Sequence, residues 1–304
     1  MEYQIKTFFS RDWQDYELLD TGDHQKLERF GKHILVRPYE DAFWKKNLSQ
    51  KEWDKADGIF FSSKGGMKSG WTLSFPNDGA ENKKKMPKWE MSYKDMKFIV
   101  SPTPFRHLGF FPEQASHWDF IEEKIKNSKR KIRFLNLFGY TGIASLFALR
   151  AGAEVTHLDA SKQSIDWLKE NQELSGLKEM PMRIIVDDAL KFVEREIKRG
   201  NRYDVIVMDP PKFGRGPKGE TWKIEENLPE LLTKIRKILS DKPLFVILTS
   251  YSTESSSLSL GHALEDMMKD FKGSIDTGEL CIIEKTNNRA ISLANTAIWT
   301  PSLA

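Results

Sequence analysis

The chain has 304 residues, of which 39% are hydrophobic and 30% are charged, and it carries a formal net charge of +3. This is the composition of a soluble globular protein, long enough for one large domain with an appendage or for two domains. No apolar run approaches the roughly 18–20 residues of a membrane span, and no signal-peptide core is present. The single cysteine, Cys281, excludes an intrachain disulfide. We therefore expect a cytoplasmic protein with no membrane partner; its slight positive charge permits RNA as a partner without requiring it.

Residues 1–100 predict a smaller β-rich domain that could bind the substrate. Short aromatic and β-branched runs are separated by glycine-containing turns, which is typical of a meander of strands. The expected strands are 16–20, 26–30, 33–37, 59–63, 71–75 and 89–93, with one short helix at 50–56. Two basic loops, 64–70 and 82–88, lie between the later strands.

Residues 101–130 are expected to connect this domain to the next one. Three prolines, at positions 102, 104 and 112, keep the first part extended. The spacing of Trp118, Ile121 and Ile125 predicts a helix over 117–128.

Residues 131–304 alternate between strands and helices. The expected strands are 132–138, 154–158, 182–186, 203–208 and 244–249, and the expected helices are 143–151, 162–175, 189–198, 224–239 and 258–271. A closing hairpin is expected from 280–285 and 290–299. Continuous apolar strands indicate coverage on both faces, so the pattern predicts a doubly wound α/β sheet that binds ligands at the carboxyl ends of its strands.

A glycine turn follows the first of these strands, in the run Phe138-Gly139-Tyr140-Thr141-Gly142. Two glycines three residues apart let the backbone approach a ligand, and the next helix offers its first N–H groups. The alternative is a plain tight turn between strand and helix. The run is not Gly-x-Gly-x-x-Gly, which counts against a dinucleotide site.

Acidic residues follow the second and third strands. Asp159 could accept hydrogen bonds from both ribose hydroxyls of a nucleoside, with Ser161 capping the next helix. Asp187 and Asp188 come after the third strand, and Asp188 is the better placed to accept a hydrogen bond from the amine of adenine. For all three carboxylates the alternative role is a helix cap.

The run Asp209-Pro210-Pro211-Lys212-Phe213 ends the fourth strand and is the most specific motif of the chain. Two prolines stop the strand and stiffen the loop, which fixes a carboxylate and a backbone carbonyl as acceptors. Phe213 offers a face on which a base can stack, and a basic, glycine-rich loop containing Arg215 follows. The alternative is a mere strand terminator with a solvated loop after it. The histidines show no metal-ligand spacing, so no metal is expected.

These motifs together resemble a class I S-adenosylmethionine-dependent methyltransferase over residues 105–250, and within that class the bacterial large-subunit ribosomal RNA methyltransferases of the 5-methylcytosine and 7-methylguanine types. The resemblance implies a seven-stranded, mostly parallel sheet that binds S-adenosyl-L-methionine. It places Gln114 and the 138–142 turn along the methionine part, Asp159 at the ribose and Asp188 at the adenine. The remaining residues implied at the cofactor are Asn136, Ser161, Asp187, Asp209 and Pro210. Catalysis falls to Asp209, Lys212 and Phe213, and substrate binding to Phe213 and Arg215.

The sequence departs from these relatives in two respects. Cytosine-C5 enzymes need a nucleophilic cysteine, which follows the fifth strand in the related enzymes, whereas here the stretch 248–252 has none. The usual amino-terminal RNA-binding module is also not recognisable. We therefore expect a methyltransferase acting on RNA, with ribosomal RNA favoured, at a base nitrogen rather than at cytosine C5. The alternatives are a protein or small-molecule methyltransferase, a nicotinamide-dependent oxidoreductase, or a non-catalytic RNA-binding protein with the same fold.

Overall fold

The computed structural model describes residues 4–62, 69–74, 87–251 and 256–302. The chain divides into two compact units. The α/β unit comprises Met1–Phe8, Ser116–Cys281 and Ser292–Ala304, and the β-rich unit comprises Phe9–Ala115 and Ile282–Ile291. The expected boundaries at residues 100 and 131 differ from this division. The expected connecting segment is shared between the units, and each unit includes a piece from the opposite end of the sequence.

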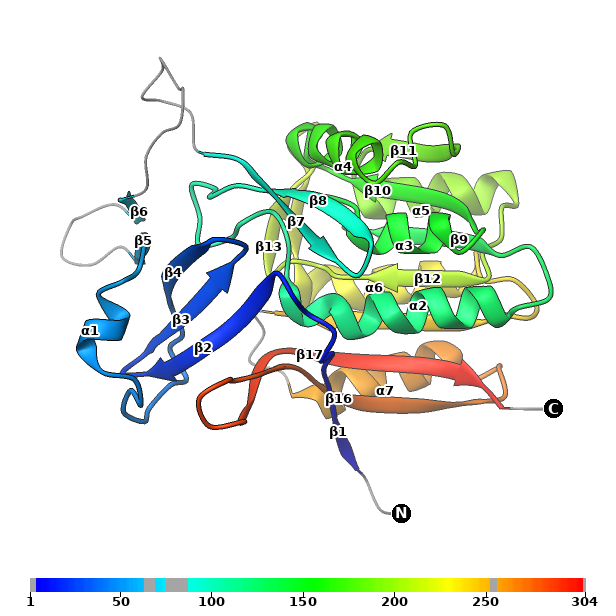
Figure 1. Cartoon of the computed structure of the whole chain (residues 1–304). Helices are drawn as coiled ribbons and strands as arrows, with labels where there is room; N and C mark the ends of the chain where they lie inside the picture. The colour runs from blue at the N-terminus through cyan, green and yellow to red at the C-terminus, as the bar shows by residue number, and fades with distance from the viewer. Residues whose placement is uncertain (1–3, 63–68, 75–86, 252–255, 303–304) are drawn as a thin grey trace. The chain divides into compact units, whose positions relative to one another are not determined.

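The α/β unit contains a sheet of eight strands in the part of the chain that the structure describes (Figure 1). Its strands lie in the order β1-β16-β17-β15-β12-β9-β10-β11. The bounds are β1 Ile5–Phe8, β9 Arg133–Leu137, β10 Glu154–Asp159, β11 Met182–Val186, β12 Val205–Met208, β15 Phe245–Ser250, β16 Gly273–Ile283 and β17 Ala290–Pro301. Neighbours from β15 to β11 run parallel, and β17 is antiparallel to β15. The predicted doubly wound, mostly parallel sheet is confirmed. It has one strand more than the seven expected, because β1 pairs in parallel with β16 at the edge.

Helices cover both faces of this sheet. Helices α5 (Ala189–Arg199), α6 (Ile224–Arg236) and α7 (Ser257–Met268) contact one another in sequence order. Helix α3 (Ile143–Arg150) contacts α4 (Lys162–Leu174) and meets α2 (Ala115–Asn127) where Trp118 stacks on Phe147 at 5.7 Å. Apolar strands are thereby buried on both sides, as their sequences predict.

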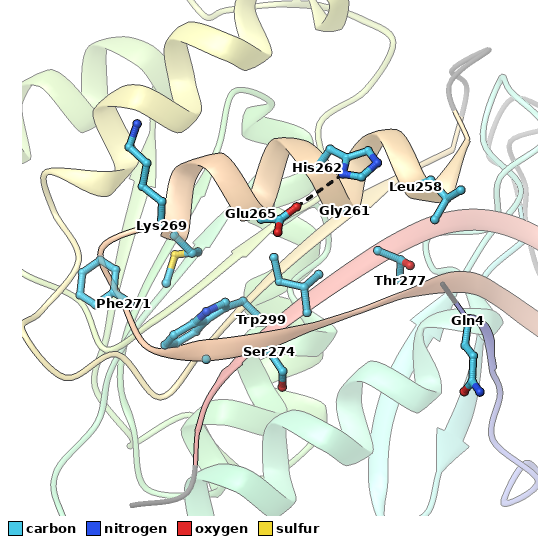
Figure 2. A pocket seen from close by; sticks show the side chains of 13 residues that line it. Gln4, Leu258, Gly261, His262, Glu265, Lys269, Phe271, Ser274, Thr277 and Trp299 are labelled. Carbon is cyan, nitrogen blue, oxygen red and sulfur yellow. Dashed lines mark hydrogen bonds and ion pairs between the residues drawn. The ribbon is translucent and has the colours of Figure 1, made fainter. Parts of the chain in front are cut away.

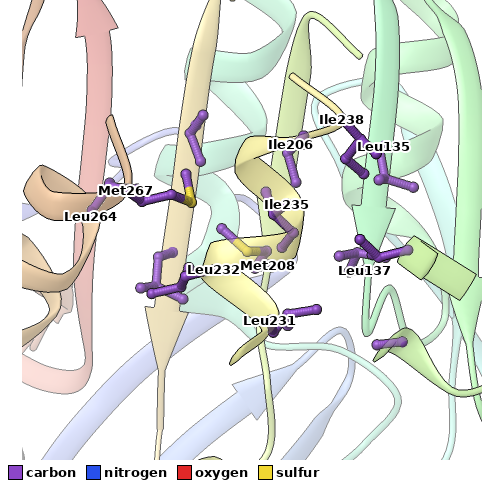
Figure 3. Packing of buried hydrophobic residues seen from close by; sticks show 14 of the residues in the cluster. Leu135, Leu137, Ile206, Met208, Leu231, Leu232, Ile235, Ile238, Leu264 and Met267 are labelled. Atoms are coloured by element: carbon purple, nitrogen blue, oxygen red, sulfur yellow. The ribbon is translucent and has the colours of Figure 1, made fainter. Parts of the chain in front are cut away.

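The hydrophobic core beneath α6 holds the strands β9 and β12 in place. Figure 3 shows Leu137 of β9 and Met208 of β12 facing Leu231 and Ile235 of α6, and all four side chains are fully buried. Burying one such side chain contributes about 1.5–3 kcal/mol. The core therefore holds β9 and β12 side by side as a rigid base for the loops that follow them.

The β-rich unit contains a five-stranded sheet in the order β2-β3-β4-β5-β6 and a separate pair, β7 and β8. The bounds are β2 Tyr16–Gly22, β3 Gln25–Phe30, β4 His33–Pro38, β5 Gly58–Phe61, β6 Gly70–Leu73, β7 Trp89–Tyr93 and β8 Met96–Val100, with α1 at Gln50–Trp53 and a 3-10 helix, η1, at Pro112–Gln114. The expected strands are present, and β8 is an additional one. The two predicted basic loops fall largely outside the described residues, as does Phe75 at the end of the strand expected at 71–75.

A buried ion pair joins β3 to β4 inside the β-rich unit. Glu28 is fully buried and accepts hydrogen bonds from the Arg37 guanidinium at 2.6 Å through both oxygens and from the Tyr16 hydroxyl at 2.8 Å. Burial alone would raise the pKa of Glu28, but the nearby Arg37 and Lys26 charges lower it to about 2. The carboxylate is therefore charged at neutral pH, and removing its partner would leave a buried charge uncompensated.

Within the described ranges, none of the helices combines the length and apolar character needed to cross a bilayer.

Candidate functional site

The strand order of the α/β unit reverses between β9 and β12. The chain runs from β9 through β10 to β11 on one side, and then from β12 to β15 on the other. Leu137 at the end of β9 lies beside Met208 at the end of β12, so the glycine turn and the Asp-Pro-Pro loop start next to each other. In open α/β sheets ligands bind at this switch point, outside the carboxyl ends of the strands.

The glycine turn has an unusual backbone. Phe138 and Tyr140 have φ angles of 58° and 51°, and Gly142 has a φ of 84°. The turn is held by hydrogen bonds from the Gly139 N–H to the Leu158 carbonyl at 2.9 Å and from the Gly142 N–H to the Gly139 carbonyl at 3.0 Å. Left-handed conformations of non-glycine residues cost about 1–3 kcal/mol and cluster at ligand sites. Gly142 begins α3 without a side-chain cap, which leaves the helix start available to a ligand.

Asp159 connects this turn to the next one. Its carboxylate accepts the Tyr140 N–H at 2.9 Å and the Ser161 N–H at 2.8 Å, while the Ser161 hydroxyl caps α4 by accepting the Ser164 N–H. Burial raises the pKa of Asp159, although the two backbone hydrogen bonds oppose this shift. A carboxylate has about four lone-pair sites, so two acceptor positions remain beyond these backbone bonds. Cap and ligand roles are therefore compatible, divided between Ser161 and Asp159 as the sequence predicts.

Asp187 and Asp188 both interact with α5. Asp188 caps the helix by accepting the Lys191 N–H at 3.0 Å, which is the alternative role that the sequence left open. Asp187 accepts the Asp188 N–H at 2.9 Å and forms an ion pair with Arg195. The carboxylate of Asp187 is thus held on the helix, whereas Asp188 uses one oxygen for its cap.

The Asp-Pro-Pro loop is fixed by a tryptophan that the sequence did not single out. The Trp222 indole N–H donates to the Pro211 carbonyl at 2.7 Å, and the Phe138 ring of the glycine turn contacts the Trp222 ring at 4.8 Å. Trp222 is almost fully buried. One side chain therefore ties the two loops of the switch point together, which supports Asp209 and Pro210 on a rigid base.

Gly214 and Arg215, which were expected to begin a basic, glycine-rich loop, lie in a strand instead. This strand, β13 (Phe213–Arg215), pairs with β14 (Thr221–Lys223) in a small hairpin. Phe213 is 63% exposed on this hairpin, with the Lys212 ammonium 5.8 Å from the centre of its ring. Arg215 is exposed on the same strand. The hairpin therefore presents an aromatic face and two cations to solvent.

Asn136 and Thr141 lie in the interior beside the turn. The Asn136 amide donates to the Ser145 hydroxyl at 2.9 Å, which lies 2.9 Å from His157 Nδ1. The Thr141 carbonyl accepts from the buried Asn171 amide at 3.0 Å. Ser145, His157 and Asn171 could not be predicted from the sequence, because their partners come from other elements.

Gln114 ends η1 in the β-rich unit, and its contact with the cofactor stays a prediction. A pocket of about 460 Å³ lies elsewhere in the α/β unit, between α7 and β16. Figure 2 shows His262 and Glu265 of α7 on its wall, with Trp299 nearby. It includes none of the predicted site residues. No group of three or more potential metal ligands occurs among the residues that the structure describes.

Comparison with known proteins identifies the family. A family model described as Conserved hypothetical protein 95 matches residues 116–275, more than half of the chain. The chain belongs to the Conserved hypothetical protein 95 family. Its residues also match a solved structure of an S-adenosylmethionine-dependent methyltransferase from Agrobacterium tumefaciens, with 40% identity, a TM-score of 0.91, and coverage of 99% of this chain and 95% of that one.

Curated relatives of this family member are named as ribosomal RNA methyltransferases. The large-subunit methyltransferase K/L of Pseudoalteromonas translucida is 33% identical over 146 residues, and the large-subunit methyltransferase I of Aeromonas salmonicida is 34% identical over 119 residues. The matches cover 47% and 39% of this chain but only 20% and 29% of those proteins. The predicted resemblance, the class I fold and the class of S-adenosylmethionine-dependent methyltransferase are confirmed, and S-adenosylmethionine is the cofactor of that class.

Proposed function

We propose that the chain transfers the methyl group of S-adenosylmethionine to RNA, with ribosomal RNA as the substrate and a base nitrogen as the acceptor. The observation that carries the proposal is the pairing of two loops at the switch point. One is the strained glycine turn with Asp159, and the other is the Asp-Pro-Pro loop that Trp222 fixes to it. The first suits a nucleoside cofactor, and the second suits a planar acceptor beside it.

The residues present fit the cofactor. The Asp159 carboxylate is partly buried, is held by two backbone N–H groups and has acceptor capacity left for two ribose hydroxyls. The uncapped start of α3 and the backbone of residues 138–142 would lie along the methionine part, and Asp188 would receive the adenine amine. When bound, S-adenosylmethionine supplies a methyl group on a positively charged sulfur. The protein's task is then to align the acceptor and to keep water out.

The residues after β12 would hold the acceptor base. The Asp209 carboxylate and the Pro210 carbonyl would accept hydrogen bonds from the base and so turn its nitrogen lone pair toward the methyl group. The exposed ring of Phe213 would stack on the base, which contributes about 1–3 kcal/mol for such contacts. Lys212 and Arg215 would contact phosphates.

The position of the single thiol supports the proposal of a nitrogen acceptor. Cys281 lies in β16, is buried, and its thiol is 3.6 Å from the Glu279 carbonyl. Strand β15 ends at Ser250 and is separated from β16 by β17, so the thiol is not at the end of β15. Cytosine C5 becomes nucleophilic only after a thiolate adds to the ring, whereas a base nitrogen needs no covalent intermediate.

The substrate class rests on the names of the curated relatives, of which this chain spans a fifth to under a third. RNA binding has a physical signature that separates it from the alternatives. Phosphate contacts release counterions, so affinity for RNA falls steeply with salt, whereas affinity for a small molecule or a protein acceptor need not.

The test is transfer of labelled methyl groups to ribosomal RNA from cells that lack this gene, followed by mass spectrometry of the nucleosides. A labelled 7-methylguanosine or another N-methylated nucleoside is the expected product. Labelled 5-methylcytidine would refute the argument from the cysteine. If the protein binds the cofactor but the RNA stays unlabelled, RNA is refuted as the substrate. Binding of NADH but not of S-adenosylhomocysteine would establish the oxidoreductase alternative.

A pair of variants sharpens this test. Asp209→Ala is expected to abolish transfer while S-adenosylhomocysteine still binds, since the carboxylate is assigned to the acceptor. Asp276→Ala is the matched control, because Asp276 is a half-exposed aspartate of β16 paired with Lys6. Full activity of Asp209→Ala contradicts the assignment.

A further inference from the structure

Behind the glycine turn lies a buried chain of three polar side chains that the proposed mechanism does not use. We infer that His157, held by Ser145 and Asn136, is a positioning residue: its ring supports the backbone of the glycine turn in the position from which the turn contacts the cofactor. This inference rests on the proposed function, because it concerns the same site. On this inference, the three side chains beneath the turn, and not only the turn itself, determine the affinity for the cofactor.

Hydrogen bonds hold the His157 ring at one nitrogen, Nδ1. Asn136 Nδ2 donates to the Ser145 hydroxyl at 2.9 Å, and the same hydroxyl is hydrogen-bonded to His157 Nδ1 at 2.9 Å. The chain joins β9, α3 and β10, the three elements whose ends build the turn and present Asp159.

The ring lies directly under Gly139. A Cβ atom added at Gly139 would lie 2.3 Å from His157 Cε1 and 3.0 Å from Nε2. The φ angle of Gly139 is not in the left-handed region, so the ring, not the backbone conformation, is what requires glycine there. Gly142 offers a contrast within the same turn: its φ is 84°, and its added Cβ would lie 1.9 Å from the Leu168 side chain instead.

Histidine is a costly choice for a residue that only fills the core. His157 is fully buried, and its Nε2 atom makes no hydrogen bond of ordinary geometry among the described residues, although the Tyr140 backbone of the glycine turn interacts with the ring. Burying a polar ring in this way costs hydration that an apolar residue would never need. Burial also lowers the pKa of His157 to about 4, which keeps the ring neutral at physiological pH. A flat ring anchored at one nitrogen supports the backbone above it at a fixed height.

A double-mutant cycle on the binding of S-adenosylhomocysteine tests this inference. Gly139→Ala alone is expected to weaken binding more than about tenfold, because the new methyl group pushes the turn off the ring. In the His157→Ala background, the same substitution is expected to cost less than about threefold, since the obstacle is gone. Gly142→Ala is the control, and its effect is expected to be the same with and without His157. Equal effects of Gly139→Ala in both backgrounds would overturn the inference.

Ser145→Ala provides a second test that keeps the ring. It breaks the chain without removing volume at His157, and it is expected to raise the KM for S-adenosylmethionine about three- to tenfold while the KM for RNA and kcat stay within about twofold. Ser145→Thr, which retains the hydroxyl, is expected to restore part of the affinity. Ser257→Ala, at an equally buried serine of α7, is the control and should leave the cofactor KM unchanged. A KM for the cofactor that is unchanged in Ser145→Ala contradicts the inference.

Failure of the two proposals can be told apart. Wild-type protein that does not bind S-adenosylhomocysteine refutes the proposed function itself. If the wild-type protein binds S-adenosylhomocysteine and the substitutions at residues 139 and 157 have additive effects on the binding free energy, only the positioning role is refuted.

Discussion

Replacing Asp159 by asparagine tests the cofactor side of the site with almost no change of shape. Its two carboxylate oxygens accept the Tyr140 N–H and the Ser161 N–H at 2.9 and 2.8 Å. An amide has only one acceptor oxygen, so in either orientation its NH2 group opposes one of these backbone donors, and the side chain can no longer accept hydrogen bonds from both ribose hydroxyls through charged oxygens. Losing one charge-assisted hydrogen bond to the ligand costs about 1.5–3 kcal/mol, which corresponds to roughly a 10- to 150-fold weaker Kd.

The assay is titration calorimetry with S-adenosylhomocysteine at neutral pH, together with a urea unfolding curve. Asp204→Asn is the matched control, because Asp204 is also buried and accepts a backbone N–H, from Arg133 at 2.9 Å. It precedes β12 and so lies at the opposite, amino edge of the sheet. Both variants are expected to lose stability, but only Asp159→Asn should lose affinity. Equal affinities of wild type and Asp159→Asn would refute the reasoning.

The same carboxylate predicts the pH dependence of binding. Burial raises the pKa of Asp159 above its ordinary value in the protein without ligand. Only the ionised form accepts hydrogen bonds from both ribose hydroxyls, so affinity is expected to be constant at high pH and to fall as pH drops through this raised pKa. The fall should therefore begin at a less acidic pH than for an exposed aspartate. In Asp159→Asn this dependence should disappear.

Three further outcomes follow from contacts described above. Trp222→Phe keeps an aromatic ring but removes the hydrogen bond to the Pro211 carbonyl, worth about 1–1.5 kcal/mol. We expect kcat to fall roughly 5- to 13-fold with cofactor affinity unchanged, and an unchanged kcat would contradict the positioning of the Asp-Pro-Pro loop. Glu28→Gln leaves Arg37 buried without its counter-charge and should lower the free energy of unfolding by about 3–5 kcal/mol in urea titrations. Because the pKa of Glu28 is lowered to about 2, the ionised side chain should contribute fully to the free energy of unfolding above the ordinary pKa of a glutamate. This contribution should be lost as pH falls toward 2, and Glu28→Gln should lack this dependence on pH. Cys281→Ser should retain full methyl transfer in the labelling assay, and loss of transfer with an intact fold would contradict the argument for a nitrogen acceptor.

The sequence predicted the α/β unit well where local signals are strong. Apolar runs and caps marked β9 to β12 and α3 to α5, with α5 beginning at Ala189 as expected after its Asp188 cap. Strand β1 was missed because Ile5–Phe8 is short, and its partner β16 lies about 270 residues away in the sequence. Residues 282–291 of the β16–β17 hairpin group with the β-rich unit, which the sequence did not indicate because their partner Leu18 is also remote.

Local signals in the sequence led to the candidate site residues but not to the residues that support them. Asp159 follows a strand and precedes a helix, and two prolines follow Asp209, so their places at the strand ends could be predicted, while their roles toward a ligand stay predictions. Trp222 and His157 act through contacts with other elements, and no spacing in the sequence pairs them with Pro211 or Ser145. Gly214 and Arg215 were expected in a glycine-rich loop because β13 and β14 have only three residues each, too few to show an alternating pattern in the sequence.

The hairpin of β16 and β17 has a consequence for how the chain folds during synthesis. The α/β sheet needs β16 to pair with β1, and the β-rich unit needs residues 282–291, where Glu284 accepts a hydrogen bond from Thr21 at 2.6 Å and the Lys285 N–H donates to the Leu18 carbonyl. Translation at about 5–20 residues per second therefore leaves β1 and β2 waiting for these partners on the order of tens of seconds. The β-rich unit therefore cannot be completed before residues 282–291 have left the ribosome, and the α/β unit cannot be completed before β16 and β17 have left it.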